Sequence, residues 1–137
     1  MSLVLDCSMA MAWCFEDEQT SQTVAVLDSV GRSGAWVPLL WRYEVANVLL
    51  MAERRGRIDA AKRHDFLDTL RDLSIREDRE PEGDPWHATV RLAELHRLTV
   101  YDAAYLELAQ RRRLPLASLD EPLRKAAGAT GVRVEPA

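Results

Sequence analysis

Two apolar runs in the sequence each end directly on an acidic residue. Residues 3–5 (Leu-Val-Leu) lack polar alternation and are followed by Asp6, and the largely apolar residues 114–119 are followed by Asp120. An uninterrupted apolar run of this length is typical of a strand buried on both faces, as in a parallel sheet. Ligands gather at the carboxyl ends of such strands. The two acids are therefore the first candidates for a functional site.

Helical periodicity, caps and glycines predict the elements around these two strands. Ser8 is the expected cap of the first helix, and Thr20 or Ser21 is the expected cap of the second. Helices are expected over residues 9–15, 39–55, 60–73, 86–98 and 122–127. The second helix is expected to begin at residue 20 or 21 and to end at the glycines at 31 and 34. One more helix is expected to begin within 99–102. Further strands are expected over 35–37 and 132–134, and the charged stretch 75–83 predicts a short edge strand or a loop.

Strands that alternate with helices indicate an α/β fold. We expect a central, mostly parallel β-sheet of four to five strands wrapped by helices. No linker, repeat or low-complexity segment interrupts the chain, and its 137 residues suit one domain over residues 1–137. A chain of this length buries roughly two-thirds of the surface that its unfolded form exposes, which is enough for an independent core.

Composition narrows the classes of function. Hydrophobic residues make up 47% of the chain and charged residues 29%, which are ordinary globular values and argue against disorder. The formal net charge of −4 argues against a protein that grips duplex DNA by bulk charge. A local basic stripe could still hold a single strand of nucleic acid.

The two cysteines, Cys7 and Cys14, predict free thiols. If both lie on the helix that begins near Ser8, about 10 Å separates them along its axis, whereas a disulfide needs Cα atoms within about 7 Å. They also lack the CxxC spacing of a metal-binding or redox pair. We therefore expect a reducing compartment, the cytoplasm. No signal peptide precedes Asp6 and no apolar run reaches the roughly 18 residues of a membrane span, so we expect no membrane association.

Acidic residues are common in this chain, so only context can single one out. Asp and Glu together make up 22 of the 137 residues. Glu44 is the only acid between Asp28 and Glu53, and it lies in the apolar stretch 39–51. A carboxylate on a buried helix face needs a partner, a proton or a metal. An ion pair with Arg42 or with a distant arginine would explain Glu44 equally well.

Asp102 and Asp120 also have structural explanations. Each lies where a helix begins, and a carboxylate there is a good N-cap. Thr99 and Asp102 have the spacing of a capping box, with Asp in place of the usual Glu or Gln. Asp6 is less ambiguous, because Ser8 is available to cap the helix that follows.

The four acids are more informative together. They are Asp6, Glu44, Asp102 and Asp120. In a parallel α/β sheet, strand ends and the helix starts that follow them share one edge. Two carboxylates ~5 Å apart repel by about 3 kcal/mol at an effective dielectric constant near 20. A converged cluster therefore needs shared protons or a divalent cation.

The type of ligand predicts the type of cation. Oxygen-only ligands favour a hard ion, Mg²⁺ or Mn²⁺. The three histidines, His64, His87 and His96, show no ligand spacing, and we expect them at the surface.

Four segments of the chain form a recognisable family pattern. They are residues 5–8, 43–49, 98–109 and 114–120, of which the stretch around Asp102 is the most diagnostic. In this order, and in a chain of this length, they resemble the PIN domains, and among them the VapC-like toxins of bacterial and archaeal type II toxin–antitoxin pairs. The resemblance covers almost the whole chain. It implies a central parallel sheet wrapped by helices, with an acidic metal pocket at one edge.

Carried over residue by residue, the resemblance implies the composition of the site. The family's acidic positions, the candidate catalytic residues, fall on Asp6, Glu44, Asp102 and Asp120. Asp6 and Asp102 are tied most directly to the metal, with Glu44 and Asp120 completing the site directly or through water. Ser8 and Ser118 match the small hydroxyl positions that support the pocket. The implied ion is Mg²⁺, with Mn²⁺ as the other candidate.

The resemblance also implies an activity. VapC-like proteins are typically endoribonucleases that hydrolyse RNA phosphodiester bonds and are silenced by a cognate antitoxin. A catalytically silent PIN-like module that binds only RNA or a partner is the alternative. An acid-cluster phosphohydrolase on another α/β scaffold is disfavoured, because Asp6-Cys7-Ser8 lacks the second Asp of a DxD nucleophile motif.

Two further patterns concern partners. Arginine clusters at 54–57 and 111–113 end helices, where they could contact RNA or simply suit the helix dipole and solvation. The first helix carries an excess of large apolar residues, some of which belong in a core: Met9, Met11, Trp13 and Phe15. The remainder would suit a homodimer, or an antitoxin helix seated in a groove.

Overall fold

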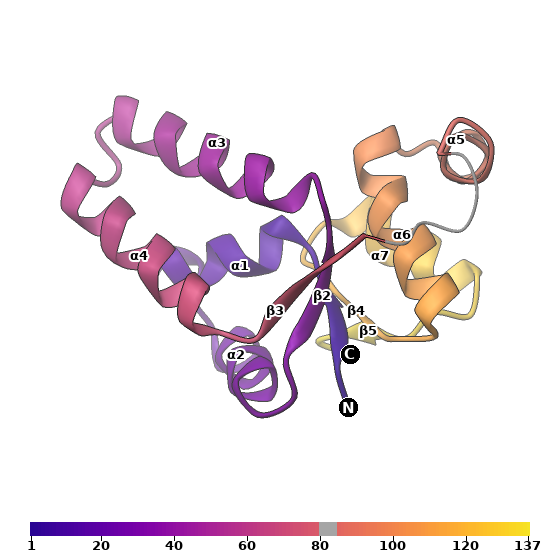
Figure 1. Cartoon of the computed structure of the whole chain (residues 1–137), viewed down its shortest axis with the longest axis horizontal. Helices are drawn as coiled ribbons and strands as arrows, with labels where there is room; N and C mark the ends of the chain where they lie inside the picture. Colours follow the sequence, from indigo (N-terminus) through magenta and orange to yellow (C-terminus); the bar gives the residue numbers. More distant parts are fainter. Residues whose placement is uncertain (80–84) are drawn as a thin grey trace.

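The computed structural model describes residues 1–79 and 85–137, and it shows a five-stranded sheet with helices on both sides (Figure 1). The strands are β1 (Leu3–Leu5), β2 (Ala35–Pro38), β3 (Ile75–Asp78), β4 (Leu116–Ala117) and β5 (Val134–Glu135). The helices are α1 (Cys7–Cys14), α2 (Ser21–Ser33), α3 (Trp41–Arg54), α4 (Ala60–Asp72), α5 (Ala88–His96), α6 (Val100–Arg112) and α7 (Glu121–Ala129), with a short 3-10 helix η1 (Glu16–Glu18) between α1 and α2.

The strands of the sheet all run parallel, in the order β3-β2-β1-β4-β5. β1 lies at the centre, with its residue Val4 aligned with Trp36 of β2 on one side and with Leu116 of β4 on the other. All three residues of β1 are buried, as expected for an apolar run that is covered on both faces. The predicted α/β fold with a parallel sheet is confirmed.

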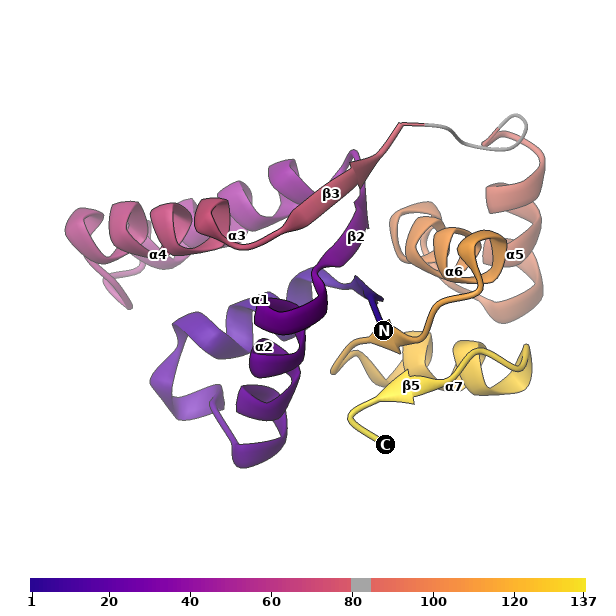
Figure 2. The same ribbon diagram turned by 60° about the horizontal axis from the view of Figure 1, so that its bottom comes forward.

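Helices form a layer on each side of the sheet. α1 to α4 lie on one side, with α3 and α4 as an antiparallel pair, and α5 to α7 lie on the other (Figures 1 and 2). The core lies between these layers and the sheet, and it includes Leu5, Leu49 and Leu106, which are fully buried. Each such side chain contributes about 1.5–3 kcal/mol relative to an exposed one. The central strand therefore supports both layers.

The carboxyl ends of parallel strands share one edge of a sheet. β1 runs upward from the N-terminus in Figure 1, so this edge is the upper one in that view. α1 begins directly after β1, α3 follows β2 and α7 follows β4, while α6 also begins near this edge. Four helix starts are therefore brought to the end of the central strand.

Most predicted elements occur, with changes at their ends. The edge strand expected within 75–83 is β3, and residues 80–83 of that stretch lie outside the described residues. The strand expected over 114–119 is reduced to the two residues of β4, and the last strand begins at Val134 instead of residue 132. These two strands are short because each pairs with its neighbour over only two residues.

Helix α2 shows which of two expected caps is used. Thr20 is the N-cap: its hydroxyl accepts a hydrogen bond from the amide of Thr23 at 3.1 Å, and its amide donates to the Thr23 hydroxyl at 2.9 Å. Gly34 ends the helix with φ +75°, and a Cβ there would lie 2.8 Å from the carbonyl oxygen of Ser74. The close approach of the chain before β2 and before β3 therefore requires a glycine.

The expected Ser8 cap is wrong. Helix α1 begins two residues earlier than expected, at Cys7, so that Asp6 is the N-cap residue and Ser8 lies in the first turn. Asp6 makes no side-chain capping bond. The Ser8 hydroxyl points back to the strand end instead, and its partners there belong to the acidic site described below.

The large apolar side chains of α1 are buried in the core of the chain itself. All four large side chains named above, Met9, Met11, Trp13 and Phe15, are at most 9% exposed. The expectation that part of this set covers a partner surface is therefore wrong, because these side chains belong to the core cluster and α1 packs against α2 and α3. The helix expected over 86–98 begins only at Ala88, and Trp86, which precedes it, is 83% exposed.

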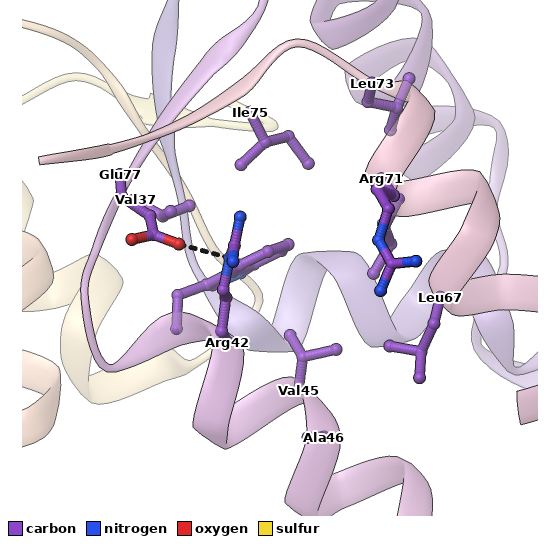
Figure 3. Close-up of a pocket in the computed structure, with 11 residues that line it drawn as sticks. Val37, Arg42, Val45, Ala46, Leu67, Arg71, Leu73, Ile75 and Glu77 are labelled. Carbon is purple, nitrogen blue, oxygen red and sulfur yellow. Dashed lines mark ion pairs between the residues drawn. The ribbon is translucent and has the colours of Figure 1, made fainter. Parts of the chain in front are cut away.

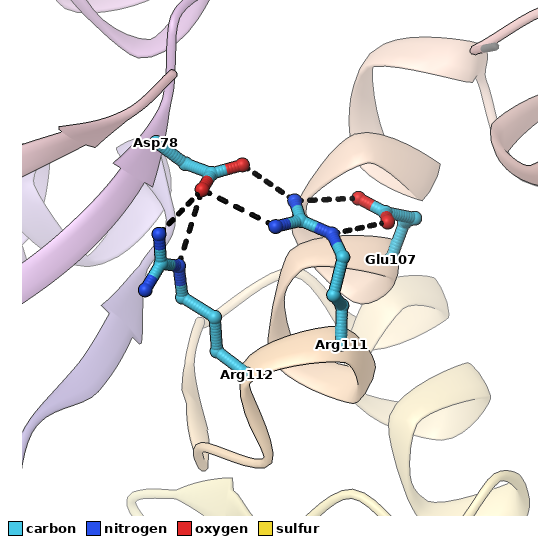
Figure 4. Close-up of polar contacts among 4 residues, drawn as sticks. All are labelled: Asp78, Glu107, Arg111 and Arg112. Atoms are coloured by element: carbon cyan, nitrogen blue, oxygen red, sulfur yellow. Dashed lines mark hydrogen bonds and ion pairs between the residues drawn. The ribbon is translucent and has the colours of Figure 1, made fainter. Parts of the chain in front are cut away.

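Two arginines of the 111–113 cluster fasten the edge strand β3 to α6 (Figure 4). Arg111 and Arg112 both donate to the buried carboxylate of Asp78, and Arg111 also pairs with Glu107 at 2.7 Å. The Arg112 guanidinium lies 3.6 Å from the centre of the Trp36 ring. These two guanidinium groups therefore have structural partners within the chain, and contact of the cluster with RNA stays a prediction.

The two arginines determine the direction in which the pKa of Asp78 is shifted. Burial favours the neutral acid, but hydrogen bonds and charge from Arg111 and Arg112 outweigh it and hold the pKa of Asp78 below its usual value. A depressed pKa stabilises the fold above the pKa of the unfolded form, and this contribution is lost as pH falls through the pKa of the folded form.

We expect Asp78→Asn to lower the free energy of unfolding by about 3 kcal/mol at pH 7, because it leaves two arginines without their shared anion. Urea unfolding at pH 7 and at low pH measures this loss, which should shrink on acidification. Asp68→Asn is the matched control, since the ion pair of Asp68 with Arg71 is largely exposed and should contribute less than about 1 kcal/mol. Equal losses in the two variants would contradict the prediction.

Candidate functional site

The carboxylate of Asp6 is buried at the end of β1 between two serine hydroxyls. Asp6 is 4% exposed. Ser8 and Ser118 each donate a hydrogen bond of 2.7 Å to the same atom, Oδ2 of Asp6. The two hydroxyl oxygens lie 3.4 Å apart. Both residues that the sequence predicts as supports therefore contact the acid that ends the first strand.

The same two hydroxyls hold the chain that follows β4. The amide of Leu119 donates to the Ser8 hydroxyl at 3.0 Å, and the amide of Asp120 donates to the Ser118 hydroxyl at 3.0 Å. Each hydroxyl thus accepts from the backbone and donates to Asp6. This arrangement joins the ends of β1 and β4 and places Asp120 at the same edge.

Asp120 lies at this edge of the sheet and also caps the helix that follows it. Its Oδ2 accepts a hydrogen bond of 3.0 Å from the amide of Leu123, so Asp120 is the N-cap of α7. The capping explanation considered for Asp120 is therefore correct. Its charge still acts on the site, because it raises the pKa of both Asp6 and Asp102.

Asp102 lies in the first turn of α6 and is half-buried. Its amide donates to the Thr99 hydroxyl at 3.1 Å, which is one half of the expected capping box. The cap is therefore the Thr99 side chain, and the Asp102 carboxylate is not needed for it.

Glu44 reaches the edge from the opposite side, in the first turn of α3. The hydroxyl of Tyr105 on α6 donates a hydrogen bond to Oε1 of Glu44. The ion pair with Arg42 considered for Glu44 does not form, because Arg42 pairs with Glu77. Tyr105 was missed in the sequence. The available signal was its position three residues after Asp102, which places both side chains on one face of α6.

The charges of these acids act on one another. Burial is the largest cause that raises the pKa of Asp6, and the charge of Asp120 adds to it, while hydrogen bonds from Ser118 and Ser8 oppose it. Burial also raises the pKa of Glu44, with further contributions from Asp6 and Asp102 and an opposing one from the Tyr105 hydroxyl. The structure therefore places the acids close enough to repel.

The donor set fits a hard divalent cation. Carboxylate and hydroxyl oxygens surround the strand end, and burial raises the pKa of the nearby Cys7 thiol, which keeps it protonated and a poor ligand. In the described residues, no three Asp, Glu, His or Cys side chains already stand as a complete metal-binding group. The repulsion between the carboxylates is the quantity that a bound cation would relieve.

A second feature is a groove between α3, α4 and β3, with a cavity of about 280 Å³ (Figure 3). Its lining is mostly apolar, and the ion pair between Arg42 and Glu77 borders it. The indole Nε1 of Trp41 is buried there without a hydrogen-bond partner in the described part of the chain. The lining includes Val37, Val45, Ala46, Leu67, Leu70, Leu73 and Ile75.

The parallel α/β sheet brings one buried aspartate and three partly buried acids to its carboxyl edge, and this combination defines a class of domain. Residues 3–129 match the sequence model of the family described as the PIN domain. The chain therefore belongs to the PIN domain family, and members of this family are generally nucleases. A search of curated proteins gave no match.

Several solved structures resemble the whole fold. PAE2754 from Pyrobaculum aerophilum is 25% identical over 98% of this chain and 92% of its own, with a TM-score of 0.71. A toxin–antitoxin complex from Klebsiella pneumoniae is 17% identical over 95% of this chain and 94% of its own, with a TM-score of 0.62. FitAcB from Neisseria gonorrhoeae is 17% identical over 98% of this chain and 96% of its own, with a TM-score of 0.63.

Over residues 1–79 and 85–137, no helix has the length and apolar character that crossing a membrane requires. Cys7 and Cys14 are both buried free thiols, as the sequence predicts.

We expect Asp6→Asn to stabilise the metal-free protein at pH 7. An unfolded Asp ionises near pH 4, whereas the raised pKa of Asp6 means that the fold loses stability as pH rises through it. Asparagine does not titrate, and its single carbonyl oxygen can accept both serine hydroxyls. Each kcal/mol gained raises Tm by roughly 4 °C in a domain of this size.

Thermal unfolding in EDTA at pH 7 and below pH 4 measures this effect. The gain should be present at pH 7 and absent at the lower pH. Asp28→Asn, at an exposed position of α2, is the control and should show no such difference. A lower Tm for Asp6→Asn than for the wild type at pH 7 would refute the electrostatic interpretation.

Proposed function

We propose that this protein is a metal-dependent endoribonuclease that acts as the toxin of a toxin–antitoxin pair. The observation that carries the proposal is the buried carboxylate of Asp6, surrounded by two serine hydroxyls and by the charges of other acids. Membership of the PIN domain family makes a nuclease the expected activity. Metal dependence agrees with an oxygen-only donor set whose members repel one another.

Each residue has a proposed part in the site. Asp6 and Asp102 hold the cation, and Glu44 and Asp120 complete its surroundings directly or through water. When bound there, Mg²⁺, or Mn²⁺ in its place, would supply an activated water and would stabilise charge on the phosphoryl oxygens. Ser8 and Ser118 fix Oδ2 of Asp6, and its other oxygen, Oδ1, is the proposed ligand atom.

RNA as the substrate agrees with the charge of the chain. The net charge of −4 suits a local grip on a single strand better than a grip on duplex DNA. Of the arginines that could supply this grip, Arg54 and Arg55 at the end of α3 and Arg113 at the end of α6 are exposed. Arg57 binds Asp17 and Glu18 instead.

Two protein partners are proposed. The likeness to two structures named for a toxin–antitoxin complex and for FitAcB supports a cognate antitoxin. The apolar groove between α3 and α4 suits a helix of such a partner. Exposed apolar side chains near the acidic edge, among them Leu39, Val100 and Leu119, suit a homodimer. Buried free thiols suit the reducing cytoplasm.

A catalytically silent PIN-like module that binds RNA or a partner is the second candidate. It is favoured by one observation: within the described ranges, no three ligand side chains already form a metal-binding group. Cleavage of RNA in Mg²⁺, abolished by EDTA, separates the two candidates.

We expect Asp102→Asn to lower Mg²⁺-dependent cleavage of structured RNA by about 100-fold or more, because it removes a proposed ligand and not only a supporting contact. The measurement is the rate of cleavage by purified protein, with circular dichroism to show that the variant is folded. Asp65→Asn, on the exposed face of α4, should cleave like the wild type. Full activity of Asp102→Asn would rule out this site.

We expect Ala46→Arg to prevent binding of the antitoxin, taken as the small protein encoded beside the gene. Ala46 is exposed and lines the groove, so an arginine would fill it without disturbing the core. Co-purification from cells that express both chains measures binding. Ala129→Arg, exposed at the end of α7 on the other side of the sheet, is the control. Unchanged co-purification of Ala46→Arg would place the partner elsewhere.

A further inference from the structure

Tyr105 joins the two helices that bring acids to the site from opposite sides of the sheet. It lies on α6 and is fully buried, and its hydroxyl donates to Oε1 of Glu44 on α3. Figure 1 shows α3 and α6 on the two sides of the sheet, with their first turns at the edge where β1 ends. The hydrogen bond therefore crosses this edge beside Asp6.

The side chain of Tyr105 is held rigidly. It belongs to the hydrophobic core cluster, and α6 packs against β1, β2 and β4. A phenol enclosed in this way has one accessible direction for its hydroxyl, and that direction is towards Glu44. The position of the donor is therefore determined by the core and not by the site.

Glu44 needs such a donor more than the other acids do. Asp6 is fixed by two hydroxyls and Asp120 by the amide of Leu123. A glutamate has one more rotatable bond than an aspartate, so it has more orientations to lose when it is ordered. Among the described residues, the Tyr105 hydroxyl is the only hydrogen-bond donor to the Glu44 carboxylate.

The hydrogen bond from Tyr105 also makes the two carboxylate oxygens of Glu44 different from each other. Oε1 accepts from Tyr105, which leaves Oε2 without a donor in the described part of the protein. The charge of Glu44 is felt by Cys7 and Tyr105, and the charges of Asp6 and Asp102 act on Glu44. The Glu44 carboxylate therefore interacts with the charges of Asp6 and Asp102, while its Oε2 takes part in no hydrogen bond within the described residues.

We propose that Tyr105 is a positioning residue that orders Glu44 for a divalent cation at the acidic edge. This inference rests on the proposed function, because it assigns Glu44 to the surroundings of the ion. Outer-shell hydrogen bonds orient ligands, and their loss weakens metal binding about 10- to 100-fold. The rival explanation is a structural tie between α3 and α6, which would act on stability alone.

A double-mutant cycle tests the proposal. The variants are Tyr105→Phe, Glu44→Gln and the two together, and the readout is the Kd for Mn²⁺ measured by calorimetry on the folded, full-length protein. We expect Tyr105→Phe to weaken Mn²⁺ binding roughly tenfold in the wild-type background and to have no further effect in Glu44→Gln. A cycle of this kind isolates the coupling between two residues.

Two additional variants support the interpretation. Tyr43→Phe removes an exposed tyrosine hydroxyl beside Glu44 in the sequence and should leave the Kd unchanged. Glu44→Asp keeps the charge but shortens the side chain by one methylene, so it should lose the Tyr105 contact and weaken Mn²⁺ binding as Tyr105→Phe does. This second variant keeps the test decisive if Tyr105→Phe does not fold.

Asp6→Asn separates failure of the inference from failure of the proposed function. Unchanged Mn²⁺ binding in Tyr105→Phe, or an equal loss with and without Glu44, overturns the positioning role of Tyr105. If Asp6→Asn abolishes Mn²⁺ binding in either of these cases, the site itself still stands. If Asp6→Asn binds Mn²⁺ like the wild type, the proposed metal site is wrong and the inference falls with it.

Discussion

The site depends on one buried carboxylate, that of Asp6, which accepts hydrogen bonds from two serine hydroxyls and forms no ion pair with a described arginine or lysine. Burial opposes its charge, and the hydroxyls of Ser8 and Ser118 offset part of that cost. The same hydroxyls accept from the backbone after β4. The geometry of the acidic edge is therefore fixed by the pairing of β1 with β4, and the site cannot form before the centre of the sheet does.

A second buried carboxylate, that of Asp78, shows that this fold can pair a buried acid with arginines. Asp78 is about as buried as Asp6, yet two arginines lower its pKa. Asp6 takes part in no ion pair in the ranges 1–79 and 85–137, and its pKa is raised. Structural carboxylates are usually neutralised by the protein itself, whereas functional ones are left for a ligand to neutralise. The contrast supports the proposal that the end of β1, and not the end of β3, is the functional edge.

The fold was predictable from the sequence because its central feature is an unbroken apolar strand. Leu3 to Leu5 can only be buried on both faces, and that requires helices on both sides of a parallel sheet. The local sequence pattern could not decide the role of a residue that suits two structural positions equally well. Ser8 is a good cap, and only the helix start at Cys7 shows that its hydroxyl serves Asp6. Likewise, Arg111 and Arg112 resemble a solvated helix end until β3 brings Asp78 to them.

The candidate acids and the two supporting serines could be named from the sequence, but the contact that orients Glu44 could not. Asp6 and Asp102 stand out by their positions at element ends, whereas Tyr105 looks like any aromatic residue on a buried helix face. Its partner Glu44 lies on a different helix, so no local spacing links the two. A cation bound at this edge would relieve the repulsion between the acids and stabilise the folded state over the unfolded one. Metal affinity and fold stability would therefore be coupled, because the hydroxyls that contact Asp6 also hold the ends of the central strands together.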